Sequence, residues 1–171
     1  SAASDVYKRQ AIMAKNNRTA SQIVSEIERL KPNVRASFVV DTLTYLYRGG
    51  RCNAVAAMAG GVLKLHPRIV VENGAMNASK KYRGKIDSVI MDYVKDMEKD
   101  LKNARPERVF ITHSGCKQET VEKVRAYLEE LDVFDEILET RAGGVISSHC
   151  GPGTLGVCLL YTSDAADDLT R

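Results

Sequence analysis

The sequence predicts an α/β domain in which helices pack on a layered mixed sheet. Helical and strand-like patterns alternate along the chain, and one helical segment would join two strand-like segments in parallel. The chain has 171 residues, 44% hydrophobic and 27% charged, which suffices for one core and hardly for two domains. Its net charge of +3 comes from interspersed basic and acidic residues, so it does not indicate a nucleic-acid partner.

The elements of the first half follow from apolar periodicity and turn-forming residues. An amphipathic helix with Thr19 or Ser21 as its N-cap ends before Pro32. A strand, a helical turn and a small-residue helix that ends at Pro67 follow, and Asn-Gly then predicts a hairpin. In order, these segments are Ser21 to Leu30, Arg35 to Val40, Thr42 to Tyr47, Ala54 to Leu65, and the paired strands Ile69 to Glu72 and Ala75 to Tyr82.

The second half contains the clearest amphipathic pattern, a long surface helix over Lys85 to Leu101 whose apolar residues keep one stripe. A strand, a helix, another strand and a glycine-rich segment follow it. These are Val109 to Thr112, Glu119 to Leu131, Asp135 to Thr140 and Gly143 to Gly156. The helix between the two strands is the expected parallel crossover.

The two ends of the chain predict a foreign origin. Ser1 to Gln10 can be encoded by a DNA sequence whose complementary strand, read in another frame, encodes CLLYTSDAA followed by Asp or Glu. Cys158 to Asp167 reads CLLYTSDAAD. Both ends therefore match one DNA element in opposite orientations, and that element resembles a transposase-based sequencing adapter. We expect residues 1–10 and 158–171 to be adapter-derived.

The remaining cysteines are Cys52, Cys116 and Cys150, which are odd in number and lack Cys-x-x-Cys spacing. This pattern predicts neither a disulfide framework nor a four-cysteine zinc site. No apolar run approaches the roughly 20 residues of a membrane span, so no membrane span is expected and the cytoplasm is the default location.

The strongest chemical cluster is Ser147 to Gly156, which combines hydroxyls, an imidazole, a thiol and a glycine-rich turn. His149 could donate a hydrogen bond to a carboxylate, and a tight turn before a strand explains the segment equally well. Gly151 to Gly156 matches Gly-x-Gly-x-x-Gly, but a β-prone segment follows where a dinucleotide site needs a helix. A His149-Cys150 nucleophile pair is weak, because neighbours on an extended chain point to opposite faces.

Three further positions are weaker candidates. Tyr47 to Arg51 places two cations beside a flexible turn that suits a phosphate, a carboxylate or an acidic surface. His113 lies at a strand end, where open α/β sheets often bind ligands, although a capped structural residue is the favoured interpretation. His66, before Pro67, has no evident partner.

Several runs occur together in one order: DTLTYLYRGGR, AVAAMAGGVLKL followed by HPRIVVENG, KKYRG, and VIxxHxGPGTLG. With this spacing, residues 41–157 resemble the DegV family. The resemblance implies a bacterial protein that binds a long-chain fatty acid, shields the acyl chain and presents its carboxylate to a fatty-acid kinase, giving an acyl phosphate. It implies a ligand-binding subunit with no catalytic residue, no metal and no cofactor other than the bound fatty acid.

The resemblance also implies the domain organisation and the roles of individual residues. Residues 11–33 would be the last helix of a missing N-terminal domain, and 34–157 the C-terminal lipid-binding domain. His149 would contact the head group, Gly151 and Gly153 would shape its loop, and Arg51 would face the kinase. Acyl-tail candidates on the small-residue helix are Val55, Met58, Ala59 and Val62.

Departures from the family pattern are Gly144, Ser147, Cys150 and His66, of which the last would alter surface charge. An alternative function is an enzyme or sensor domain that holds a phosphorylated small molecule in the glycine-rich loop. A helix directly after Gly156 would favour that alternative, whereas a strand there favours the lipid binder. A third possibility is that the fragment alone is inactive, because half of the site is missing.

Overall fold

A computed structural model describes residues 2–50, 65–72 and 74–161 of the chain. It begins with two helices, α1 (Ala2–Lys15) and α2 (Ala20–Leu30), and a short 3-10 helix over Lys31–Asn33. The expected helix is confirmed as α2. Its N-cap is Thr19, whose hydroxyl accepts from the backbone of Gln22 while the Gln22 side chain accepts from the Thr19 N–H. This reciprocal capping satisfies two N–H groups that the first turn leaves free.

The described strands form one six-stranded mixed sheet in the order β3-β2-β1-β6-β4-β5. All neighbours are antiparallel except β4 and β5, which are parallel. Helix α6 (Gln118–Glu130) connects that pair, so the expected crossover is confirmed. The strands are β1 (Val34–Val39), β2 (Leu65–Glu72), β3 (Ala75–Arg83), β4 (Val109–Ser114), β5 (Ile137–Arg141) and β6 (Thr154–Leu160).

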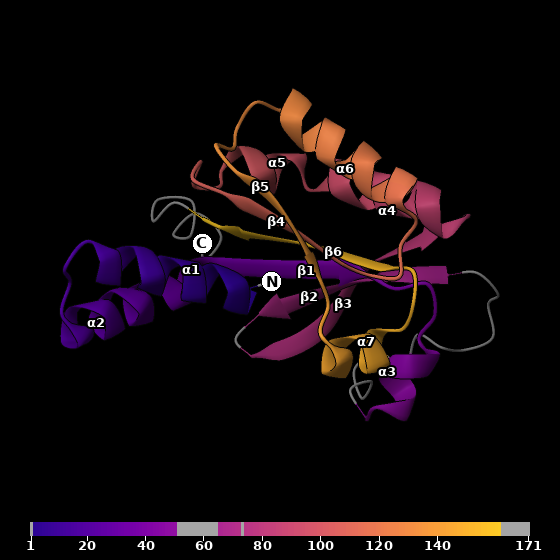
Figure 1. Ribbon diagram of the computed structural model, residues 1–171. Helices are drawn as coiled ribbons and strands as arrows, with labels where there is room; N and C mark the ends of the chain where they lie inside the picture. Colours follow the sequence, from indigo (N-terminus) through magenta and orange to yellow (C-terminus); the bar gives the residue numbers. More distant parts are fainter. Residues whose placement is uncertain (1, 51–64, 73, 162–171) are drawn as a thin grey trace.

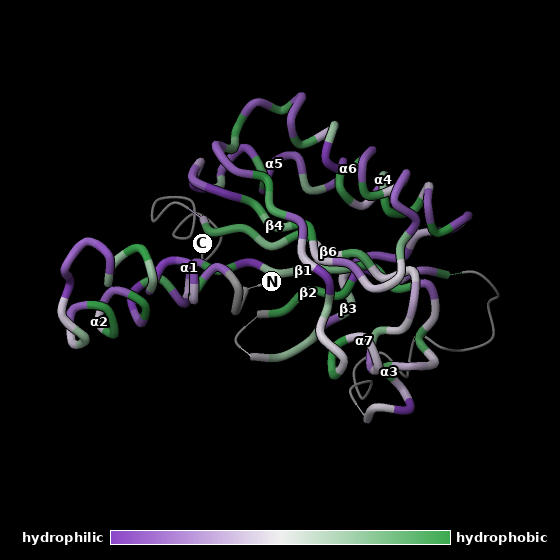
Figure 2. The backbone as a smooth tube through the Cα atoms, viewed as in Figure 1, coloured by the Kyte–Doolittle hydropathy of each residue, from purple (hydrophilic) through white to green (hydrophobic). Residues whose placement is uncertain are grey.

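Helices cover both faces of this sheet (Figure 1). One face carries α6 together with α4 (Ile86–Asp96) and α5 (Glu98–Lys102), whose apolar stripes form the larger core with the central strands. The opposite face carries two short helices, α3 (Thr44–Arg48) and α7 (Gly144–Cys150), over a smaller core. Figure 2 shows hydrophilic residues on the outer turns of α6 and hydrophobic stretches along the central strands, as expected for amphipathic elements on a buried sheet.

Two expected helices differ in the structure. Leu65 opens β2 instead of ending a helix, and the rest of the expected Ala54 to Leu65 helix lies outside the described residues. Pro67 fits this strand because pairing of β2 with β1 begins only at Arg68, so the missing N–H of proline interrupts no ladder on that side. The expected helix over Lys85 to Leu101 is divided into α4 and α5 at Met97, where the backbone leaves helical geometry.

The two chain ends are part of this fold. Helix α1 spans residues 2–15, and the buried Asp5 carboxylate lies 3.3 Å from the Arg108 guanidinium. Strand β6 continues through Leu160, with Cys158 paired to both Ala36 and Phe110. The ends that are expected to be adapter-derived therefore form the first turns of α1 and the last residues of the central strand β6.

Candidate functional site

His149 lies in the last turn of α7, which packs against α3 (Figure 1). The expectation that His149 and Cys150 lie on an extended chain is wrong, because Gly144–Cys150 is helical. The expected tight turn before a strand is confirmed for Gly151 to Gly153, which lead into β6. The conclusion about the His149-Cys150 pair still holds for another reason. Cys150 points into the smaller core with Val40, Leu46 and Ile69, whereas His149 is partly exposed.

The hydrogen bonds of His149 define the nitrogen that can meet a ligand. Its Nδ1 lies 2.7 Å from the Val145 carbonyl oxygen. A carbonyl can only accept, so Nδ1 carries the hydrogen and donates it. Nε2 is then the ring nitrogen that this bond leaves for another partner, which it can accept from when the ring is neutral and donate to when the ring is protonated. A protonated ring can thus hold a carboxylate through a charge-assisted hydrogen bond.

The turn after His149 is held by three segments that are distant in the sequence. The backbone of Gly151 is at φ +79°, and a Cβ built there would lie 2.3 Å from the Tyr45 ring on α3. The Gly153 N–H donates to the Ser114 carbonyl at the end of β4, and Gly153 also packs against Asp41 after β1. The turn thus joins the ends of β1 and β4 to the start of β6.

The Gly-x-Gly-x-x-Gly pattern does not open a helix. Strand β6 begins at Thr154, and Gly156 lies within it against the Ser37 carbonyl of β1. A dinucleotide-binding loop needs a helix start at this point to bind phosphate. The observed strand is the arrangement that favours the lipid-binding interpretation over a phosphate-binding loop.

The other two histidines are structural. His66 is 4% exposed, so the expectation that it alters surface charge and lacks a partner is wrong. Its ring nitrogens face the carbonyl oxygens of Val40 at 3.3 Å and Gly84 at 3.0 Å, and Nδ1 lies 3.6 Å from the Asp41 carboxylate. This burial follows from its place in β2, which brings the ring between β1 and the loop that leads into α4.

His113 is also buried, at 2% exposure. Its Nε2 lies 3.2 Å from the Glu139 carboxylate on β5, and Arg125 of α6 lies 3.5 Å from the same side chain. This network lies beneath α6, not in an open strand-end cleft. The structure therefore confirms the structural interpretation of His113.

Exposed apolar side chains occur on α7, the helix of His149, and on its neighbour α3. Tyr47 on α3 is 71% exposed, and Val145 and Ile146 on α7 are 73% and 57% exposed. Large apolar side chains that remain in solvent together are typical of a surface covered by a ligand or partner. We name Tyr47, Val145 and Ile146 the α3-α7 surface. Sequence analysis did not identify this surface, because the Val145-Ile146 pair lies in a glycine-rich segment for which no helix was expected.

Several predicted site residues lie outside the described residues. These are Arg51 and the acyl-tail candidates Val55, Met58, Ala59 and Val62. The exposed Arg48 at the end of α3 is the cation of the Tyr47 to Arg51 run that the structure places.

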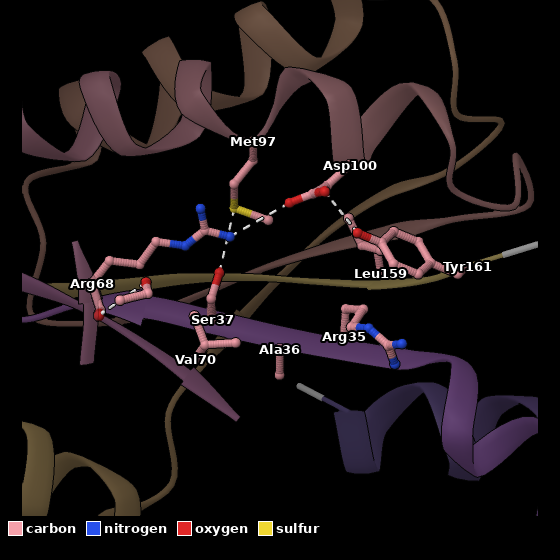
Figure 3. A pocket seen from close by; sticks show the side chains of 10 residues that line it. Arg35, Ala36, Ser37, Arg68, Val70, Met97, Asp100, Leu159 and Tyr161 are labelled. Atoms are coloured by element: carbon pink, nitrogen blue, oxygen red, sulfur yellow. Dashed lines mark hydrogen bonds and ion pairs between the residues drawn. The ribbon is translucent and has the colours of Figure 1, made fainter. Parts of the chain in front are cut away.

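A separate cavity of about 240 Å³ lies on the other face of the sheet, between β1, β2 and α5 (Figure 3). The Arg68 guanidinium lies 3.5 Å from the Asp100 carboxylate, which also accepts a hydrogen bond from the Tyr161 hydroxyl at 2.7 Å. Arg35 stacks over the Tyr161 ring. Leu159 and Tyr161, which also line it, lie in the end of the chain that is expected to be adapter-derived.

Within residues 2–50, 65–72 and 74–161, no helix combines the length and apolarity needed to cross a membrane. The same part of the chain contains no cluster of three or more His, Cys, Asp or Glu side chains arranged to hold a metal ion.

The fold is a mixed α/β domain in which His149, a glycine turn and exposed apolar residues of α3 and α7 lie at one end of the sheet. Residues 6–162 match the family model described as "Uncharacterised protein, DegV family". The chain therefore belongs to the DegV family.

Individual proteins show the same relationship. The chain is 34% identical to a DegV domain-containing protein of Clostridium perfringens over 151 residues, which cover 88% of this chain and 51% of that protein. It is 30% identical to a Thermotoga maritima protein named fatty acid-binding protein, covering 84% of this chain and 50% of that protein. The chain thus spans about half the length of these curated relatives.

A solved structure shares the fold. It is described as fatty acid binding of a DegV family protein from Thermus thermophilus, and it superposes with a TM-score of 0.82 at 25% identity. The matched region covers 94% of this chain and 57% of that protein.

Proposed function

We propose that this chain is the C-terminal part of a protein that binds a long-chain fatty acid, with His149 as the head-group contact. The observation that carries the proposal is the Nε2 atom of His149, which lies on the same helix pair as the α3-α7 surface. A polar group beside apolar side chains matches a ligand with one carboxylate and a long apolar tail. The relatives described as fatty-acid binding support this interpretation.

The tail supplies the affinity and the head group sets the orientation. Burial of an acyl chain contributes roughly 0.8 kcal/mol per CH₂. In our proposal Gly151 and Gly153 shape the head-group turn through their contacts with Tyr45 and Ser114. The tail lies along Val55, Met58, Ala59 and Val62, and a missing N-terminal domain, which ends in residues 11–33, completes the site.

We infer further that the protein serves a kinase as its ligand-binding subunit in the cytoplasm. A carboxylate oxygen held at His149 would attack the γ-phosphorus of ATP on the partner kinase, giving an acyl phosphate and ADP. The chain's own thiol beside the site suits catalysis poorly, because burial raises the pKa of Cys150. Arg51 would contribute to the surface that meets the kinase.

Binding is tested on the full-length protein purified from its native gene. We expect native mass spectrometry to detect a co-purified acyl chain and oleate to bind the delipidated protein. His149→Ala should weaken oleate binding about tenfold or more, as for loss of one hydrogen bond to a charged group. Glu122→Ala, an exposed change on α6 across the sheet, is the matched control. Absence of both a bound acyl chain and oleate binding would reject the proposal.

The kinase role has its own test. A fatty-acid kinase catalytic subunit, ATP and oleate should form acyl phosphate only when the full-length protein is added. Arg51→Ala should lower this turnover while oleate binding stays unchanged. Equal turnover with and without the protein would reject the kinase role and leave fatty-acid binding untouched.

The origin of the two ends is tested by sequencing the genomic locus. We expect the native gene to diverge from the present chain before Ala11 and after Val157. A genomic sequence that encodes Ser1 to Gln10 and Cys158 to Asp167 would reject the adapter origin.

A further inference from the structure

The adjacent glycines at the end of α3 differ in what surrounds them. Gly49 has φ −79° and ψ 0°, a turn conformation that does not require glycine. A Cβ built on Gly49 would nevertheless lie 2.2 Å from Cδ2 and 2.9 Å from Nε2 of His149. Gly50 shows the reverse situation, since its φ is +67° and a Cβ there would meet nothing within 4 Å.

From this difference we propose that Gly49 is a positioning residue for His149, while Gly50 serves only the turn of the backbone. The shortest described anchor of the His149 ring is the hydrogen bond from Nδ1 to the Val145 carbonyl, and the Ser148 hydroxyl lies 3.3 Å from the same nitrogen. With that anchor kept, the ring edge with Cδ2 and Nε2 lies directly over Gly49. Because Gly49 has no side chain, the His149 ring can occupy this position and its Nε2 atom has open space beside it.

A methyl group at Gly49 would leave the ring two unfavourable choices. The ring either breaks its 2.7 Å bond to Val145 to move away, or it stays and loses open access to Nε2. Real Cβ atoms essentially never approach a neighbour within 3.0 Å, so the ring or α3 must shift. This inference rests on the proposed function where it concerns fatty acid, since Nε2 is the proposed carboxylate contact.

The steric part is tested without any ligand by a double-mutant cycle on the full chain. We expect Gly49→Ala to lower the urea unfolding midpoint in the wild-type background and to have much less effect when His149→Ala is already present. Residues in contact show such non-additivity, whereas independent sites add. Gly50→Ala is the matched control, because its backbone strain should be the same with or without the His149 ring.

A spectroscopic measurement follows the ring itself. The chain has three histidines, so the imidazole nitrogen signals can be assigned by substitution. We expect Gly49→Ala to change the Nδ1 and Nε2 signals of His149 and to leave those of His66 and His113 unchanged. Gly50→Ala should leave the His149 signals at their wild-type positions.

The functional part is measured with oleate and the full-length protein. Gly49→Ala should weaken oleate binding about tenfold or more, the effect of losing the charge-assisted hydrogen bond, and Gly50→Ala should bind as the wild type does. The positioning role would be overturned if the effects of Gly49→Ala and His149→Ala on the unfolding midpoint add and the His149 signals stay unchanged. It would also be overturned if the His149 ring moves in Gly49→Ala while oleate still binds with wild-type affinity. A wild-type protein that binds no oleate would overturn the proposed function alone, because the cycle uses no ligand.

Discussion

Tyr93 provides the sharpest test of how the helical layer is fixed to the sheet. It is fully buried on α4, and its hydroxyl donates to the Ser37 carbonyl of β1 at 2.8 Å. The same oxygen accepts from the Val157 N–H of β6 at 3.0 Å. One side chain therefore ties α4 to two neighbouring central strands. Burial raises the pKa of Tyr93 to about 12, so the hydroxyl keeps its proton across the range in which the fold is studied.

Replacement by phenylalanine isolates this tie. The ring still fills its place in the core, so the change opens almost no cavity. It leaves the buried Val157 N–H, the Ser37 carbonyl and the Ser37 hydroxyl without this partner. We therefore expect Tyr93→Phe to lower the free energy of unfolding by about 1 to 3 kcal/mol. The matched control is Tyr127→Phe, whose hydroxyl meets Glu98 near the surface and whose loss should cost less than about 1 kcal/mol.

Urea unfolding followed by far-UV circular dichroism measures both variants under the same conditions. Amide hydrogen exchange adds a local signal, because the Val157 N–H should exchange faster in Tyr93→Phe than in the wild type. Equal unfolding free energies for the two tyrosine variants, with unchanged exchange at Val157, would refute the argument that the buried hydroxyl stabilises the sheet.

Three further predictions concern the site and its surroundings. Gly151→Ala should lower the free energy of unfolding, measured in urea, by about 2 to 4 kcal/mol, because it adds backbone strain and a clash with α3. Gly50→Ala adds strain alone and should cost about 1 kcal/mol. Equal losses in the two variants would contradict the clash. The hydrogen bond from Lys117 lowers the pKa of Asp87, so the ionised Asp87 stabilises the fold at neutral pH, and this stabilisation is lost as the pH falls through the folded-state pKa. In Asp87→Asn, the melting temperature should therefore fall less between neutral and acidic pH than it does in the wild type. Burial raises the pKa of Cys150, so iodoacetamide should modify it more slowly in native than in unfolded protein by peptide mass spectrometry, and equal rates would show an accessible thiol.

Much of the fold could be predicted from local pattern alone. The capped helix α2, the Asn-Gly hairpin and the crossover helix α6 each have short-range signals, and the structure contains all three. Helix α7 could not be predicted in this way. Its sequence GVISSHC combines glycine with β-branched residues, which favour turns and strands. Packing against α3 and burial of Cys150 in the smaller core support the helix instead.

His66 shows a second limit of local reasoning. The sequence places it beside a proline after an expected helix, where a polar side chain would be exposed. The structure places it within β2, because pairing with β3 extends this strand back to Leu65. Strand pairing is a non-local property, so the burial of His66 and its contacts with Val40 and Gly84 have no signal in the neighbouring sequence.

The candidate site depends on the strand order more than on any single motif. Strand β6 lies antiparallel between β1 and β4. The C-terminal ends of β1 and β4 therefore lie beside the N-terminal start of β6, at one end of these central strands. Tyr45 and Gly49 follow β1, Ser114 ends β4, and His149 precedes β6. The motif residues that flank these strands are therefore brought together by topology. We therefore expect a change that loosens β6, such as loss of the Tyr93 bond to Val157, to disturb the turn next to His149 from the other face of the sheet.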